Sequence, residues 1–245
     1  MLFRSLVPTA EEDPLIHADV LSAYFALPKG FLFLTPEEEA LVASRMASGT
    51  PSAVIGSGLD AAAETVDLSP LDALGLDDPF VLYLGRVDPN KGCQALLRHF
   101  LRYAETGRRV QLVMAGPASM PIPNHPQIRA LGFVHEPLRE ALLAKARALV
   151  MPSRYESLSM VLLEAWNHGL PALVNARCKV LRGQVRRADG GLYYGNAVEF
   201  IAGLDYLLDH PDVARQLGRQ GRAYVDREYR WPIVMNKVEG LLRAM

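Results

Sequence analysis

The chain has 245 residues and a formal net charge of −1 at pH 7; half of its residues are hydrophobic and 22% are charged. This composition is typical of a soluble globular protein with a sizeable core, and a charge near zero argues against a nucleic-acid or anionic-membrane partner. The two cysteines, Cys93 and Cys178, have neither metal-ligand nor redox spacing, so a reducing, cytoplasmic location is expected. Residues 1–14 turn acidic too soon for a signal peptide, and no apolar run reaches the roughly 18 residues of a membrane helix.

The first 60 residues predict only pieces of an α/β layer. Three apolar stretches have the length of short strands: residues 2–7, 31–34 and 52–55. After the second, Thr35 suits a helix N-cap, Pro36 the first helical position and Glu38 the partner of Thr35 in a capping box. Residues 61–79 are rich in alanine, acidic residues and proline. We therefore expect an incomplete N-terminal α/β domain over residues 1–60, followed by a linker.

From residue 80 the chain alternates short apolar runs with amphipathic segments. Strands are expected at residues 80–85, 110–116, 131–134, 149–152 and 171–175, with helices at 93–106, 137–148 and from 200 onward. This alternation predicts an α/β fold with a Rossmann-like parallel sheet that helices cover on both faces. We expect it to span residues 80–225, with a C-terminal helix over 226–245 that packs back toward the N-terminal part. Ligands of such sheets bind beyond the carboxyl ends of the strands.

The stretch YESLSMVLLEAWNHGLP, residues 155–171, carries the clearest chemical pattern. Its apolar residues follow the spacing of one buried helix face, and Gly169 with Pro171 predicts where the helix ends. Glu156 would lie in the loop before the helix and Glu164 two turns into it, roughly 10 Å further along the axis. The unpaired amides of the first turn could hold phosphate oxygens between them. The alternative is a solvated Glu156 and a partly exposed Glu164 on the polar face of the helix.

Two cations follow the first strand of the regular region. Arg86 and Lys91 stand at its carboxyl end, and a guanidinium fork beside an ammonium suits a diphosphate. Both could also be ordinary surface charges. The run Leu131–Gly132–Phe133–Val134 could offer backbone groups and a ring to a nucleobase, or could simply be the edge of a core strand.

Several other chemistries lack their signatures. The six histidines show no metal spacing and no paired nucleophile, and the basic run from Arg177 to Arg187 is typical of a solvated helix face. No G-x-G-x-x-G, P-loop or G-x-S-x-G motif occurs. These absences disfavour a nicotinamide enzyme, a nucleoside triphosphatase and an α/β-hydrolase.

From residue 31 onward the chain resembles the retaining nucleotide-sugar glycosyltransferases of group 1, which have two Rossmann-like domains in the GT-B arrangement. The matching pieces, in order, are VLYLGRVDPNKG, LVMAG, LGFV, ALVMPSRYESLSMVLLEAWNHGLPALV, GLYY and a closing helix that contains tryptophan. Two features depart from the family. The N-terminal domain is represented only by its last part, and Ser157, Leu158 and Ser159 stand where many relatives carry a glycine.

The resemblance implies a role for each candidate residue. Arg86 and Lys91 would hold the donor diphosphate, Glu164 the ribose hydroxyls, and Phe133 with Val134 would lie near the base. Glu156 would lie beside the transferred sugar as the catalytic residue, and the amides from Ser157 through Leu158 and Ser159 to Met160 would help to hold sugar and phosphate. The resemblance also implies transfer with retention, with neither a metal nor a cofactor.

We therefore expect the donor-binding half of a glycosyltransferase, which takes a UDP-, GDP- or ADP-sugar and a carbohydrate or lipid acceptor. Peripheral membrane contact and homo-oligomers are compatible with this reading. Two alternatives stay open: a nucleotide-sugar epimerase or hydrolase on the same architecture, and a non-catalytic module or inactive fragment that binds the donor or nothing.

Overall fold

The computed structural model describes residues 23–76 and 79–245, so the strand expected at residues 2–7 lies outside the described part. The chain divides into two compact units. One consists of residues 1–56 together with 235–245, and the other of residues 57–234. Helix α9 (Trp231–Ala244) runs across the boundary between them. In the part of the chain that the structure describes, no helix is long and apolar enough to cross a bilayer.

The smaller unit contains a two-stranded parallel sheet, in which β1 (Phe31–Phe33) pairs with β2 (Ser52–Val54). Helix α2 (Pro36–Val42) connects the two strands, followed by the short 3-10 turn η2 (Ala43–Arg45). The Oγ1 of Thr35 accepts the Glu38 amide at 3.3 Å, as expected for its N-cap. The Glu38 carboxylate reaches one residue further back than a capping box predicts, to the Leu34 amide at 2.7 Å.

The larger unit is built around one parallel sheet. Its strands in chain order are β3 (Phe80–Leu84), β4 (Gln111–Ala115), β5 (Ile128–Gly132), β6 (Leu149–Met151), β7 (Ala172–Asn175) and β8 (Gly191–Tyr194). They are arranged as β5-β4-β3-β6-β7-β8, and every pairing is parallel. The chain therefore winds outward in one direction from β3 and in the other from β6. This is the strand order of a doubly wound Rossmann-like fold, as the sequence predicted.

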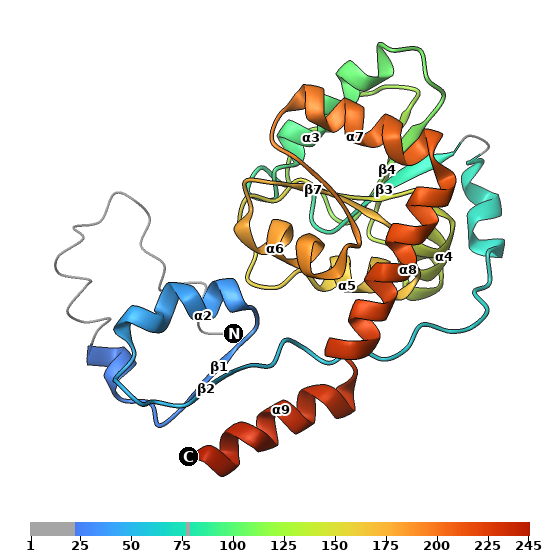
Figure 1. Ribbon diagram of the computed structural model, residues 1–245. Coiled ribbons are helices and arrows are strands. Elements are labelled where there is room, and N and C mark those ends of the chain that lie inside the picture. Colours follow the sequence, from blue (N-terminus) through green and yellow to red (C-terminus); the bar gives the residue numbers. More distant parts are fainter. Residues whose placement is uncertain (1–22, 77–78) are drawn as a thin grey trace. The chain divides into compact units, whose positions relative to one another are not determined.

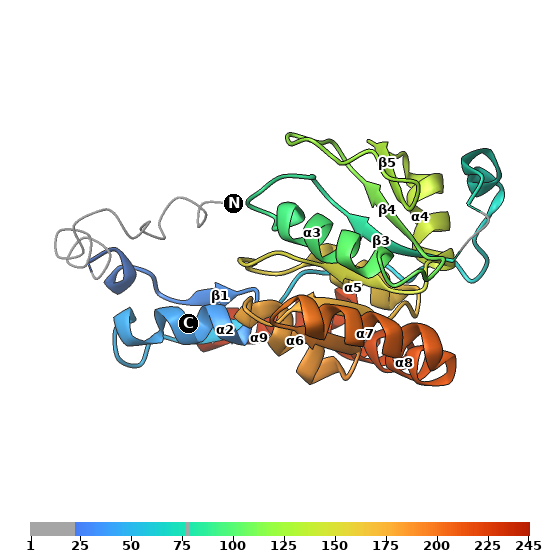
Figure 2. The ribbon, with the colours of Figure 1, turned by 90° about the horizontal axis from the view of Figure 1, so that it is seen from above.

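Helices cover both faces of this sheet. They are η3 (Ser69–Leu74), α3 (Cys93–Ala104), α4 (Glu136–Lys145), α5 (Met160–Asn167), α6 (Lys179–Ala188), α7 (Ala197–Asp209) and α8 (Pro211–Glu228). Figure 1 shows α3 and α7 above the sheet and α4, α5 and α6 below it, and Figure 2 shows α3 and α4 on opposite sides of β3 and β4.

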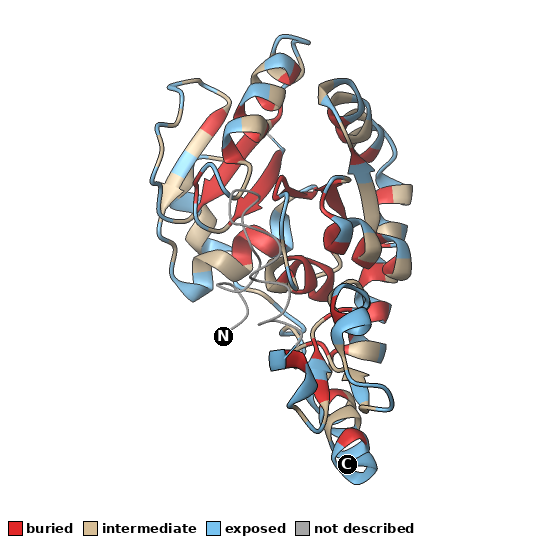
Figure 3. Cartoon of the chain, turned by 90° about the vertical axis from the view of Figure 1, so that its left-hand side faces the viewer, coloured by how far each residue is buried: buried red, intermediate tan, exposed pale blue. Residues whose placement is uncertain are grey.

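Successive side chains of β3 point to opposite faces of the sheet, so each helix layer packs against alternate residues of the strand. The side chains of Phe80, Leu82 and Leu84 are buried against α4, α5 and α6, whereas Val81 and Tyr83 are buried against α3 and α7. Because both faces are covered, the strand is apolar at every position rather than at alternate ones. Figure 3 shows the buried residues concentrated in the strands and on the helix sides that face them.

Two of the elements expected to carry site residues, β5 and α5, differ from the sequence prediction. The strand expected at residues 131–134 is β5, which begins and ends earlier, because Ile128 pairs with Leu112 and is buried. Gly132 then has a φ of +65°, which turns the chain out of the sheet. As a result Phe133 and Val134 lie beyond the strand, and the Phe133 side chain is in solvent, 82% exposed.

Helix α5 begins later than its apolar pattern indicates. The Oγ of Ser159 accepts the Leu162 amide, so Ser159 is the N-cap and the helix begins at Met160. Ser157 and Leu158 consequently belong to the preceding loop, and Glu164 lies little more than one turn into the helix rather than two. The C-terminus is where the sequence placed it, since Gly169 follows the helix with a φ of +69°.

Candidate functional site

The candidate site lies at the carboxyl edge of the larger sheet, between β3 and β6. The loop after β3 leads toward α3 on one face, and the loop after β6 leads toward α5 on the other. Such a reversal of winding opens a crevice between the two loops. All four expected charged residues, Arg86, Lys91, Glu156 and Glu164, come from these loops or from the helix that follows the second one.

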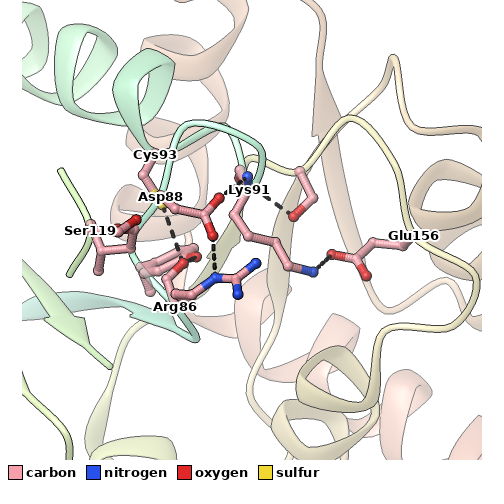
Figure 4. Close-up of polar contacts among 9 residues, drawn as sticks. Arg86, Asp88, Lys91, Cys93, Ser119 and Glu156 are labelled. Atoms are coloured by element: carbon pink, nitrogen blue, oxygen red, sulfur yellow. Dashed lines mark hydrogen bonds and ion pairs between the residues drawn. The ribbon is translucent and has the colours of Figure 1, made fainter. Parts of the chain in front are cut away.

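An ion pair between Lys91 and Glu156 connects the loop after β3 with the loop after β6. The Nζ of Lys91 donates to the Oε1 of Glu156 at 2.7 Å, and the side chains are 24% and 8% exposed. The alternative of a solvated Glu156 is therefore wrong. Figure 4 shows this pair reaching across from one loop to the other. A cation and a carboxylate are thus held together at the carboxyl edge of the sheet.

Arg86 is positioned by Asp88, a residue that the sequence analysis did not single out. The Asp88 carboxylate, which is buried, accepts from the Arg86 Nε and from the Lys91 amide, the latter at 2.9 Å. Burial alone raises the pKa of Asp88, but hydrogen bonds from the Lys91 amide and the Arg86 guanidinium outweigh it and hold the pKa below its usual value. Arg86 itself is 56% exposed, so the terminal nitrogens of its guanidinium remain accessible to a ligand.

Hydrogen bonds and close backbone contacts hold the loop that follows β3 in place. The hydroxyl of Tyr83 donates to the Arg86 carbonyl at 2.6 Å, and burial raises the pKa of this phenol, which keeps its proton in place. Gly92 has a φ of +76°, and a Cβ there would lie 2.3 Å from the Pro152 carbonyl oxygen. Only glycine permits this approach of the two loops. Asn175, from the end of β7, donates to the same carbonyl at 2.9 Å.

Glu164 is also paired, through a residue of α4. The Nη1 of Arg139 lies 2.8 Å from the Glu164 Oε1, and the two side chains are 30% and 19% exposed. Arg139 further contacts Glu140 at 3.3 Å, and the other Glu140 oxygen accepts from the Nε2 of His168 at 3.0 Å. We call these four residues, Glu164, Arg139, Glu140 and His168, the α4–α5 ladder. One oxygen of Glu164 is thus engaged, while the other can accept from a ligand.

The remaining expected residues surround the crevice less closely. Phe133 and Val134 follow β5, where Val134 packs on the core and Phe133 is exposed. Ser157 is exposed, Leu158 packs on the core, and Ser159 is buried as the N-cap of α5. Of the amides expected to hold phosphate, only that of Met160 therefore belongs to the helix.

Sequence reasoning missed Asp88 and Arg139. The signal for Asp88 was available, since an aspartate two residues after Arg86 and three before Lys91 can accept both an Arg nitrogen and a loop amide. Arg139 gave no signal, because its partner lies on a different helix. Among residues 23–76 and 79–245 no group of three or more His, Cys, Asp or Glu side chains converges as a metal site would.

A comparison against known families agrees with the fold. The family model described as Glycosyl transferases group 1 matches residues 78–210, more than half of the chain. The chain belongs to this family, as the sequence motifs implied.

Two curated relatives illustrate the match. Over 192 residues the chain is 25% identical to an alpha-D-kanosaminyltransferase of Streptomyces kanamyceticus, and the aligned region covers 70% of this chain and 47% of the relative. Over 166 residues it is 29% identical to a glycogen synthase of Mycobacterium tuberculosis, and the aligned region covers 63% of this chain and 40% of the relative. The chain thus spans less than half the length of these relatives.

Solved structures show the same fold. The sucrose-phosphate synthase of Thermosynechococcus elongatus aligns with a TM-score of 0.77 and 22% identity, over 97% of this chain and 63% of that one. HepE of Anabaena, solved in complex with UDP, aligns with a TM-score of 0.80 and 14% identity, over 97% and 70% respectively. At these identities the likeness concerns the fold alone.

Proposed function

We propose that the larger unit binds a nucleotide-sugar in the crevice between β3 and β6 and presents it for glycosyl transfer with retention. The observation that carries the proposal is the Lys91–Glu156 pair, which holds a cation and a carboxylate together at the point where the winding of the sheet reverses. Arg86 and Lys91 would bind the diphosphate. The solved complex of HepE with UDP makes UDP-sugars the first donors to test.

In this proposal the chemistry takes place at the anomeric carbon of the sugar. The bond from that carbon to the diphosphate oxygen breaks, a bond to the acceptor oxygen forms on the same face, and the acceptor proton passes to the departing diphosphate. Arg86 and Lys91 would stabilise the negative charge that grows on the leaving diphosphate. Glu156 would bind the sugar, and Glu164 would accept hydrogen bonds from the ribose hydroxyls.

Binding titrations of the full chain test the diphosphate contacts. Wild type, Arg86→Ala and Lys91→Ala are titrated by calorimetry with UDP, GDP and ADP. Loss of one charge-assisted contact is expected to weaken binding by about 10- to 100-fold, equivalent to about 1.5–3 kcal/mol. Arg98→Ala, which removes an exposed arginine of α3, is the matched control and should bind like wild type. Equal affinities for all four proteins would overturn the proposal.

The two glutamates separate sugar from nucleotide recognition. Glu156→Gln releases Lys91 from its carboxylate partner, so the affinity for UDP should stay the same or rise, while the UDP-sugar binds more weakly. Glu164→Gln should reduce the preference for UDP over 2′-deoxy-UDP. If Glu156→Gln weakened UDP and UDP-sugar equally, the sugar would lie elsewhere.

A second candidate function is donor binding without transfer. The matches cover 47% of the kanosaminyltransferase and 40% of the glycogen synthase, so the activity of those whole proteins is not carried over to this chain. Tight donor binding, combined with the absence of transfer to any acceptor in a mixed panel, would favour this candidate. Release of free sugar or of an epimer without acceptor would instead indicate a hydrolase or epimerase.

A further inference from the structure

A second cavity opens at the opposite, amino-terminal edge of the larger sheet. Its volume is about 630 Å³. The residues that immediately precede four strands contribute to its wall: Pro79 before β3, Arg109 and Val110 before β4, Arg147 shortly before β6, and Pro171 before β7. Because the Lys91–Glu156 pair lies at the carboxyl edge, a ligand here would not overlap the nucleotide-sugar crevice.

All charged residues that the structure describes in the lining of this cavity are basic. They are Arg108, Arg109, Arg147 and Arg215, with His168 beside them. Two of these arginines are engaged, since Arg108 pairs with Asp205 and Asp209, and Arg215 with Asp212. Arg109 and Arg147 have no side-chain partner among the described residues.

The two unpaired arginines are placed to act together. They precede β4 and β6, the two neighbours of β3, so their backbones are separated by about two strand spacings, roughly 10 Å. An arginine side chain is long enough for both guanidiniums to reach one anion between them. The forked geometry of a guanidinium matches phosphate oxygens. Apolar residues such as Leu143, Leu170 and Leu207 line the rest of the cavity.

We propose that this cavity is a binding site for a small phosphorylated metabolite, with Arg109 and Arg147 holding its phosphate group. The cavity volume falls in the range of small-molecule sites, and the mixture of an apolar wall with a few convergent charges is the usual composition of such sites. The site is separate from the donor crevice, and the proposal does not depend on the activity of the chain.

Calorimetric titration with ribose 5-phosphate tests this site in the full chain. The expected result is saturable binding that is weakened at least 10-fold in Arg109→Ala and in Arg147→Ala. The Arg86→Ala/Lys91→Ala double variant should bind it like wild type, and the two cavity variants should bind UDP like wild type. Circular dichroism checks that each variant is folded, which is expected because Arg109 and Arg147 are exposed.

Two results would overturn the proposal. One is the absence of saturable binding up to about 10 mM ribose 5-phosphate. A dissociation constant above that concentration corresponds to a binding free energy of less than about 3 kcal/mol. Another is binding that is lost in Arg86→Ala/Lys91→Ala but kept in the cavity variants.

Discussion

At the scale of single residues, Asp88 links the two cations of the crevice, because one buried carboxylate accepts both from Arg86 and from the backbone of Lys91. Asp88→Asn keeps an acceptor for the Lys91 amide but cannot accept from Arg86 with its NH₂ group. We expect nucleoside diphosphate affinity to fall by about 5- to 10-fold and the free energy of unfolding at pH 7 to fall by about 1 kcal/mol. Asp212→Asn, at an exposed ion pair of α8, is the control and should change neither quantity.

The same substitution has an expected pH signature. The pKa of Asp88 is lowered in the folded chain, so the folded state binds fewer protons than the unfolded state. The stabilisation is therefore complete above the unfolded pKa of about 3.9, and it is lost as the pH falls through the lowered folded value. Denaturant unfolding between about pH 5 and pH 2 should show a shallower pH dependence for Asp88→Asn than for wild type. Parallel curves would contradict this assignment.

At the scale of elements, helix α8 packs against α5 through small residues. A Cβ on Gly218 would lie 1.8 Å from the Gly169 carbonyl oxygen, and one on Gly221 would lie 2.3 Å from the Trp166 ring. Gly218→Ala must therefore separate the two helices, and we expect it to lower the free energy of unfolding by about 1–3 kcal/mol. Gly240→Ala in α9 is a matched control, because apart from its chain neighbours and the backbone of its own helix nothing lies within 4 Å of its Cβ position.

Thermal unfolding compares the two variants directly. Gly240→Ala should leave the protein unchanged or raise its stability by up to about 1 kcal/mol, since alanine is the better helix former. The informative result is that the two substitutions change the free energy of unfolding in opposite directions. If both substitutions stabilised the chain, the helices would not pack as closely as the structure indicates.

The elements also show which parts of the fold the sequence pattern predicts and which it does not. The strands β3, β4, β6 and β7 were predictable because each is a continuous apolar run bounded by glycine, proline or charged residues. The start of α5 was not, because Ser153, Ser157 and Ser159 are all suitable caps and only packing selects the third. For β5, the apolar run that ends at Val134 was misleading, since Gly132 turns the chain out of the sheet. In the site, Lys91 and Glu156 were identifiable by motif, but their mutual pairing was not.

At the scale of the whole molecule, the described residues of the smaller unit form a small core. Its buried hydrophobic cluster consists of Phe25, Phe31, Phe33 and Val42, and its parallel sheet has two strands. Parallel sheets are normally covered on both faces, yet Leu32 of β1 is 49% exposed and Leu41 of α2 is 61% exposed. We expect this apolar surface to cause self-association that increases with protein concentration.

Light scattering of wild type, Leu32→Glu and Val198→Glu checks this expectation. Leu32→Glu should shift the population toward monomer, whereas Val198→Glu changes an exposed residue of α7 in the larger unit and should not. The same preparations can be assayed with UDP-, GDP- and ADP-sugars and mixed acceptors. We expect donor binding with little transfer, because transfer requires an acceptor to be held over the donor and water to be excluded. Rapid multiple turnover by a monodisperse monomer would contradict both expectations.

The α4–α5 ladder has a thermodynamic consequence. Glu164 stands at the crevice, His168 lines the cavity at the other edge, and Arg139 with Glu140 connects them by contacts of 2.8, 3.3 and 3.0 Å. If occupancy at one end changes the affinity at the other by some factor, equilibrium requires the same factor in the reverse direction. Measuring UDP affinity with and without ribose 5-phosphate gives that factor, and Glu140→Gln, which replaces the charged middle of the ladder with a neutral amide, should bring it closer to one. The two edges of a single sheet would then behave as one cooperative unit.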